Sequence, residues 1–156
     1  MQQIIAVVED LIISILWSIS PFGESKVGIP YGIAKGVNSY LVFFACFLAN
    51  LLVFPIMMFF LDYVNKILVQ WRPYKKAAVW VAQRAKIGSR DKIKKFGFFG
   101  LVLFVMVPLP GTGVYAGTIA AYLFKIERKK AFMANAVGIF FSSIIIWFLT
   151  VSVKGF

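Results

Sequence analysis

Residues 96–124 read FGFFGLVLFVMVPLPGTGVYAGTIAAYLF, an apolar stretch that six residues interrupt, Pro108-Leu109-Pro110-Gly111-Thr112-Gly113. Two prolines and two glycines so close together end a helix rather than kink it. About 11–12 apolar residues remain on either side, which is roughly half of the ~20 that a membrane-spanning helix needs. The stretch therefore predicts a re-entrant hairpin of two half-helices, with Pro108 and Pro110 at its break.

A second stretch, near the start of the chain, has the same form. Residues 4–17 are mostly apolar, and the break that follows at residues 20–23 contains Pro21. A short second arm comes next and contains Pro30. We therefore expect a first re-entrant hairpin over residues 4–36, in which Pro21 and Pro30 are the breaking residues.

The two remaining apolar stretches, residues 40–61 and 131–153, are each long enough to cross a bilayer once. The chain of 156 residues is 61% hydrophobic and 15% charged, whereas soluble domains average about 45–50% and about 25%. A soluble domain of this size could not bury so much apolar surface. We therefore expect a single all-α integral membrane domain over residues 1–156, built from two re-entrant hairpins and two transmembrane helices.

The rare residue types exclude several classes of function. The chain has no His, one Cys (Cys46) and six acidic residues. A disulfide within the chain, a His/Cys metal site and a His-dependent catalytic triad are therefore excluded. Since no nucleophile–base pair is visible either, we expect no enzyme, no cofactor and no metal. A removable signal peptide is not expected, because no basic residues precede the first apolar stretch.

The 17 basic residues are concentrated in two segments, with ten in residues 64–95 and four in residues 125–130. If residues 96–124 form a hairpin, both segments face the same side of the membrane, whereas a single crossing would separate them. The positive-inside rule favours the hairpin and makes residues 64–95 a cytoplasmic loop of a plasma-membrane protein, with both termini outside. We expect this charge to face membrane lipids rather than nucleic acid.

The order hairpin, span, basic loop, hairpin, span predicts an inverted repeat, with residues 4–63 as the first copy and residues 96–153 as the second. Because one span separates the two hairpins, they would enter the membrane from opposite sides. A shift of 85 residues aligns five identical pairs, Gly28 with Gly113, Gly32 with Gly117, Phe47 with Phe132, Ala49 with Ala134 and Asn50 with Asn135. Both second arms thus carry Gly-xxx-Gly, which allows helices to approach closely in lipid.

Glu24 lies at the expected tip of the first hairpin, deep in the membrane, and Lys26 is its nearest counter-ion. Ionisable side chains at this depth are costly and are candidates for function by default. Glu24 can be a carboxylate that exchanges a proton or binds substrate, or it can form a structural ion pair with Lys26. The sequence leaves both interpretations open.

The second arm of each hairpin would begin near the middle of the membrane, with unpaired backbone N–H groups and the positive end of its dipole. Two such ends that meet from opposite sides predict an anion site. The other candidate substrate-binding residues are polar residues or glycines, namely Ser25, Asn50, Gly111, Thr112, Gly113 and Asn135. For Asn50 and Asn135, hydrogen bonding between helices is an equally good explanation.

Two longer motifs carry a family resemblance. They are Glu24-Ser25-Lys26-Val27-Gly28-Ile29-Pro30, followed by Gly32-Ile33-Ala34 and Gly36, and residues 108–113, followed by Ala116-Gly117 and Ile119-Ala120. These motifs resemble those of the small multidrug export protein family, over the whole chain in length and order. That family commonly has Arg at the position of Lys26. The family is more distantly similar to the DedA/VTT superfamily, which has paired re-entrant hairpins and includes transporters of polyprenyl-phosphate lipids.

The resemblance implies membrane transport, and the residues leave three hypotheses open. In the first, an amphiphilic anion such as a lipid phosphate binds where the hairpin tips meet, Glu24 exchanges a proton, and Lys26 holds the anion. In the second, the protein is a proton-coupled exporter of lipophilic cations, with Phe22, Tyr31 and Tyr115 as aromatic walls. In the third, it is a membrane scaffold that transports nothing. Because one chain offers little wall around a cavity, we expect a homodimer.

Overall fold

The structure, a computed structural model, describes residues 2–73, 75–76, 79, 90–108 and 112–154. Its helices are α1 (Gln2–Ile19), α2 (Glu24–Ala34), α3 (Ser39–Leu68), α5 (Arg90–Met106), α6 (Val114–Leu123) and α7 (Arg128–Lys154). No strand occurs among the described residues. The expected all-α architecture is therefore confirmed.

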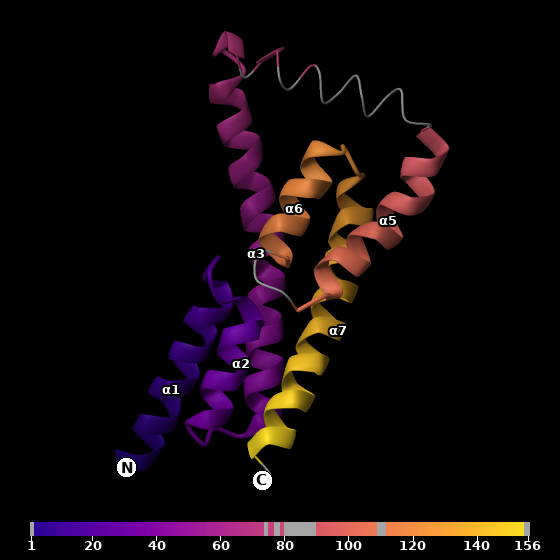
Figure 1. Ribbon diagram of the computed structural model, residues 1–156. Helices are drawn as coiled ribbons and strands as arrows, with labels where there is room; N and C mark the ends of the chain where they lie inside the picture. Colours follow the sequence, from indigo (N-terminus) through magenta and orange to yellow (C-terminus); the bar gives the residue numbers. More distant parts are fainter. Residues whose placement is uncertain (1, 74, 77–78, 80–89, 109–111, 155–156) are drawn as a thin grey trace.

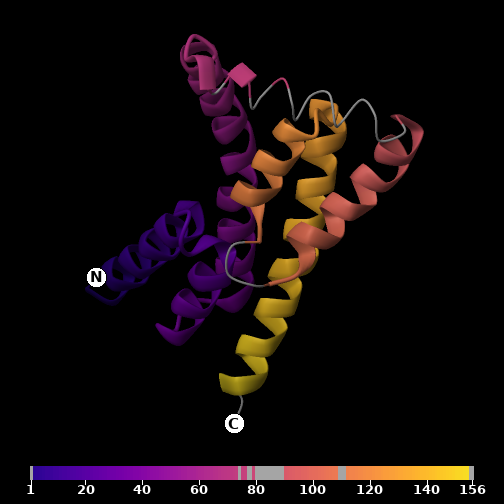
Figure 2. The same ribbon diagram turned by 45° about the horizontal axis from the view of Figure 1, so that its top comes forward.

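The helices form two antiparallel pairs on a framework of two long helices (Figure 1). α1 packs against α2, and α5 packs against α6, while α3 and α7 run side by side through the molecule. The turn between α1 and α2 and the start of α6 both lie near mid-length of the long helices. In Figure 1, both chain termini lie at one end of the molecule, and the end of α3 lies at the other. The turned view in Figure 2 again shows α3 and α7 as neighbours.

The expected helix breaks are present in both pairs. α5 ends at Met106, just before Pro108, and α6 begins directly after Gly113. In the first pair, the Ser20 carbonyl accepts hydrogen bonds from the N–H groups of Gly23 and Glu24, at 3.2 and 3.0 Å. This turn contains Pro21 and separates α1 from α2, as the sequence predicted.

Pro30 does not break the first hairpin, and this part of the prediction was wrong. It lies inside α2, which continues without interruption to Ala34. A proline in a helix loses one backbone hydrogen bond. The loss is tolerated because the buried side chains of Ile29 and Ile33, on either side of Pro30, pack α2 into the interior. Tertiary packing here outweighs the local preference of proline.

Three helices are longer than the apolar stretches that predicted them. α3 continues beyond residue 61 to Leu68, α5 already begins at Arg90, and α7 begins at Arg128. Residues 90–95, expected in the basic loop, are therefore helical. An ion pair of 2.7 Å between Arg128 Nη2 and Asp62 Oδ2 links the start of α7 to the distal part of α3.

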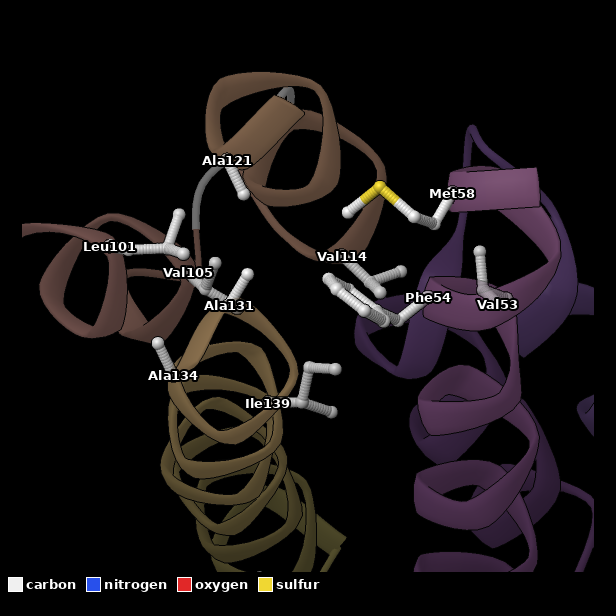
Figure 3. Packing of buried hydrophobic residues seen from close by; sticks show 10 residues of the cluster. All are labelled: Val53, Phe54, Met58, Leu101, Val105, Val114, Ala121, Ala131, Ala134 and Ile139. Atoms are coloured by element: carbon white, nitrogen blue, oxygen red, sulfur yellow. The ribbon is translucent and has the colours of Figure 1, made fainter. Parts of the chain in front are cut away.

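The interior has two apolar clusters. The larger one joins α3, α5, α6 and α7, and it includes Phe54, Met58, Val105, Val114 and Ile139 (Figure 3). The smaller one lies between α2 and α3. These clusters fix the second hairpin and the first hairpin, respectively, against the long helices.

The glycines of α2 allow close contact with α1, as the Gly-xxx-Gly pattern predicted. A Cβ atom at Gly28 would lie 2.1 Å from Ser18 Oγ, and one at Gly32 would lie 2.6 Å from Ser14 Oγ. Neither position can hold a side chain without separating the two helices.

The long helices have the length and surface of membrane spans. The most apolar windows of α3 and α7 have mean hydropathies of 2.5 and 2.2. Only 44% and 22% of these windows are buried inside the protein, whereas a core helix of a soluble protein would be mostly buried. Large apolar side chains such as Ile56, Phe59 and Phe148 point outward. Such a surface is stable in lipid rather than in water.

Candidate functional site

The tips of the two hairpins meet at the carboxylate of Glu24. This residue begins α2 and is buried, with 6% of its surface exposed. The backbone N–H groups of Val114 and Tyr115, in the first turn of α6, donate hydrogen bonds to its carboxylate. These N–H groups have no partner within their own helix, and the positive end of the helix dipole favours an anion there. Glu24 therefore occupies the anion-binding end of α6.

Gly113 makes this close approach possible. It directly precedes α6 and has a φ of 147°, a conformation that residues with a side chain rarely adopt. A Cβ atom at this position would lie only 1.9 Å from Glu24 Oε2. Both the backbone conformation and the contact with the carboxylate therefore require glycine.

Lys26 links the first hairpin to the second through a different set of atoms. Its Nζ atom lies 3.5 Å from Glu24 Oε2, and the two side chains are 14% and 9% exposed. The same Nζ donates a hydrogen bond to the Thr112 carbonyl oxygen and lies 3.5 Å from Thr112 Oγ1. Thr112 Oγ1 donates to the Val107 carbonyl oxygen at 2.6 Å. The partly buried ammonium and the buried carboxylate thus compensate each other's charge.

A third contact between the hairpins comes from Tyr115. Its hydroxyl donates a hydrogen bond to the carbonyl oxygen of Ile19, the last residue of α1. The last carbonyls of a helix have no partner within that helix, so this bond satisfies one of them. Tyr115 thereby contacts both ends of the first hairpin's break, through its backbone N–H and its hydroxyl.

A pocket of about 240 Å³ opens beside these contacts. Its lining combines the charged and polar side chains of Glu24, Lys26 and Thr112 with the apolar side chains of Phe22 and Ile119. Apolar walls with a few convergent polar groups are typical of small-molecule sites. The arrangement suits a ligand with one charged end and one apolar end.

The backbone of Glu24 is strained. Its φ of 53° lies in the left-handed region, which non-glycine residues seldom adopt. Strained residues persist only where the surrounding structure holds them, and they cluster at ligand sites and switch regions. The strain at Glu24 is therefore a second feature, besides buried charge, that is typical of a functional position.

Ser25 follows Glu24 in the sequence but belongs to a different cluster. Its Oγ accepts hydrogen bonds from Asn50 Nδ2 at 3.2 Å and from Ser143 Oγ at 3.0 Å. All three side chains are buried, and they join α2, α3 and α7. Asn50 thus makes the interhelical hydrogen bond that was its alternative explanation, and the pocket lining does not include it.

Asn135 lies apart from the hairpin tips. Its Nδ2 donates to the Ala131 carbonyl oxygen of its own helix at 2.9 Å. Its Oδ1 lies against α6, because a Cβ atom at Gly117 would be 2.4 Å from that oxygen. Asn135 therefore contributes to the packing of α6 on α7 and does not contact the ion pair.

The structure brings together four of the predicted site residues, Glu24, Lys26, Thr112 and Gly113. Pro21 lines the same pocket, and Pro108 follows the end of α5. Pro110 and Gly111 lie outside the described residues. Ser143 was not foreseen, although two adjacent serines at positions 142–143 of an apolar span were a visible signal. Among the described residues, no group of three His, Cys, Asp or Glu side chains could hold a metal ion.

Apolar helices that expose most of their surface, packed around a largely buried ion pair on α2, define a helical integral membrane protein. The chain belongs to the family described as "Putative small multi-drug export protein", whose sequence profile matches residues 24–145. Both sequence motifs lie within this range, so the resemblance is confirmed, and the family's name indicates a role in membrane export. No curated protein and no solved structure matches the chain. The more distant similarity to the DedA/VTT superfamily stays a prediction.

Proposed function

We propose that the protein is a proton-coupled membrane transporter of an amphiphilic anion, whose acidic group competes with the Glu24 carboxylate for the start of α6. The observation that carries this proposal is the pair of hydrogen bonds from the N–H groups of Val114 and Tyr115 to Glu24. A helix N-terminus that binds one carboxylate can bind another carboxylate or a phosphate. Membership of the export family supports membrane transport at a coarser level.

Protonation of Glu24 is the step that frees the proposed site. While Glu24 is charged, it neutralises Lys26 and satisfies the start of α6. Once Glu24 is protonated, the Lys26 ammonium and the two N–H donors lack an anion, so a substrate anion becomes their best partner. Binding of a proton and binding of the substrate anion therefore favour each other, which is the thermodynamic basis of coupled transport.

The apolar part of the pocket favours a substrate with an apolar tail. Phe22 and Ile119 line the pocket beside the charged groups, and Phe22 is 92% exposed at its outer edge. An organic acid or a lipid phosphate would place its head at Lys26 and its tail along these side chains. A homodimer would enclose such a path better than one chain with two spans.

We propose that both helix pairs are re-entrant hairpins. α2 and α6 have 11 and 10 residues. Each is therefore about 15 Å long, roughly half of the ~30 Å hydrocarbon core. The two pairs open toward opposite ends of the molecule in Figure 1, which supports entry from opposite sides. By the positive-inside rule, the end near residues 64–95 would be cytoplasmic and both termini would be outside.

The backbone supports an inverted repeat in a register that differs from the sequence alignment. Positive φ occurs at Glu24 and Gly113, where the half-helices start, and at Gly36 and Lys125, after they end. The members of each pair are 89 residues apart, as are the first residues of α3 and α7. The shift of 89 residues in the backbone and the shift of 85 residues in the sequence alignment differ by about one helical turn. Both shifts therefore match the same face of a helix in the first repeat with the same face of its counterpart in the second.

The test measures the melting temperature of the detergent-purified protein with octanesulfonate or tetraphenylphosphonium, whose charges do not change with pH. A ligand of the folded state raises the melting temperature. We expect octanesulfonate to stabilise the protein, and to do so more strongly at acidic than at alkaline pH. Glu24→Gln should keep this stabilisation and lose its pH dependence. Glu9→Gln, which changes an exposed carboxyl of α1, should behave as the unmodified protein does.

Transport provides the second measurement. In proteoliposomes, a gradient of octanesulfonate should drive proton movement in the unmodified protein and not in Glu24→Gln. Stabilisation by tetraphenylphosphonium that grows at alkaline pH and disappears in Glu24→Gln would support a cation exporter instead. No response to either ligand would support a scaffold that transports nothing.

A further inference from the structure

A second hollow lies between α5 and the end of α6. In Figure 1, α6 ends toward the end of the molecule opposite the chain termini. The hollow has a volume of about 360 Å³, and its lining is apolar throughout, with Gly97, Gly100 and Phe104 from α5 and with Phe124 and Ile126 at the end of α6. It shares no lining residue with the pocket at the hairpin tips. We call this hollow the α5–α6 groove.

The groove exists because two residues of α5 lack side chains. Gly97 and Gly100 are three positions apart and therefore lie on one face of the helix. A Cβ atom at Gly100 would meet no other atom within 4 Å, so this glycine is not needed for close packing. A glycine inside a helix costs about 1 kcal/mol relative to alanine, and Gly100 has no positive φ that would explain it. Its effect on the structure is to leave the groove open.

Positive charge lies at the rim of the groove. Lys125 is flanked in the sequence by the lining residues Phe124 and Ile126. Lys129 comes four residues later, in the first turn of α7. Arg128 and Lys130 form ion pairs with Asp62 and Glu127, whereas Lys125 and Lys129 form no ion pair within the part of the chain that the structure describes.

The backbone of Lys125 gives a separate indication. Its φ is 52°, in the left-handed position after a helix that glycine usually fills. After α2, the residue with positive φ is indeed a glycine, Gly36. A lysine at such a position is strained, and its side chain is exposed rather than packed. The helix dipole and the positive-inside rule both favour a basic residue here, and a charged ligand at the rim of the groove would use the same charge.

We propose that the α5–α6 groove is a binding site for one anionic phospholipid, with an acyl chain in the groove and the phosphate on Lys125 and Lys129. The apolar lining matches the chain, and the unpaired lysines match the charge of the headgroup. The site is independent of the proposed transport site, because it involves neither Glu24 nor the start of α6. Bound lipid would hold the second hairpin against the membrane at a constant position.

The test compares phosphatidylglycerol with phosphatidylcholine of the same acyl chains, added to the detergent-purified protein. We expect phosphatidylglycerol to raise the melting temperature clearly more than phosphatidylcholine does. Gly100→Leu should abolish the difference by filling the groove, and its Cβ fits without a clash. Lys125→Asn keeps a residue that tolerates positive φ, and should weaken phosphatidylglycerol binding about fivefold. Lys35→Asn, an exposed lysine after α2, is the matched control and should change nothing.

Equal stabilisation by the two lipids, or an unchanged response in Gly100→Leu, would overturn the proposal. So would an equal effect of glycerol phosphate, because a headgroup without a chain does not need the groove. Glu24→Gln should keep the full response to phosphatidylglycerol. A loss of the lipid site and a loss of the transport site are thereby distinguishable.

Discussion

The half-helices α2 and α6 begin in opposite ways. α2 starts with a charged residue, Glu24, whose N–H donates to the Ser20 carbonyl oxygen within its own turn. α6 starts after Gly113, and its first N–H groups donate to Glu24 of the other hairpin. One hairpin therefore supplies the charges, and the other supplies backbone donors and the space for them.

This difference shows that the site is a joint property of two unlike hairpins. If both half-helices started with a glutamate, two like charges would lie together at the tips. If both started after a glycine, two helix N-termini would lack an anion. The anion-binding end of α6 is occupied only because the hairpins differ at this position.

The largest effect is expected from Gly113→Ala, which changes the start of α6 where the Glu24 carboxylate lies. The added Cβ would collide with the Glu24 carboxylate, and alanine is strained at a φ of 147°. Together the clash and the strain should cost about 4 kcal/mol. Urea or thermal unfolding in detergent measures the loss. Gly100→Ala is the control, and it should gain up to about 1 kcal/mol because its Cβ meets open space.

Glu24→Gln and Lys26→Met each remove one of the two charges at the start of α2. Each single change leaves the other charge, largely removed from solvent, without its partner, which should cost about 3 kcal/mol of unfolding free energy. The double variant should lose much less than the sum, because no uncompensated charge remains. A double-mutant cycle of unfolding free energies measures this coupling. Strict additivity would contradict the ion pair.

Tyr115→Phe removes one contact between the two hairpins and leaves the charges of Glu24 and Lys26 in place. The Ile19 carbonyl would lose its hydrogen bond from the tyrosine hydroxyl. We expect a loss of about 1 kcal/mol in unfolding free energy. Tyr63→Phe changes a hydroxyl on a residue that is 61% exposed, and it should have almost no effect.

The smallest effect is expected away from the hairpin tips, at the ion pair between Asp62 and Arg128. Their side chains are 28% and 68% exposed, so water and salt screen the pair. Asp62→Asn should cost about 0.5 kcal/mol at low ionic strength and nothing at high salt. Unfolding measured at two salt concentrations tests this, and a loss as large as that of Glu24→Gln would contradict it.

The breaks and the apolar helices were predictable because their causes are local. The prolines and glycines of residues 108–113 end a helix wherever they occur, and runs of apolar residues form helices in lipid. Pro30 was the exception. Its local preference predicted a break, but the packing of Ile29 and Ile33 keeps α2 continuous.

The site was predictable in part. Glu24 and Lys26 were visible because ionisable residues are rare in apolar sequence, and Thr112 and Gly113 because they lie in the break. Their pairing was not predictable, since the residues that touch are 86 to 91 positions apart. Ser25 illustrates the same limit, because it follows Glu24 in the chain but bonds to Asn50 and Ser143 on other helices.

Composition, charge bias and the two proline–glycine breaks were enough to establish a membrane protein with interrupted helices, because each can be read along the chain without knowing which helices contact one another. The partner of each buried polar group was decided by the packing of the two hairpins on α3 and α7. A buried charge or N–H group without a partner is costly, but burial alone does not determine which residue becomes the hydrogen-bond or ion-pair partner. Which carboxylate satisfies the start of α6 therefore depends on the arrangement of helices that are far apart in the chain.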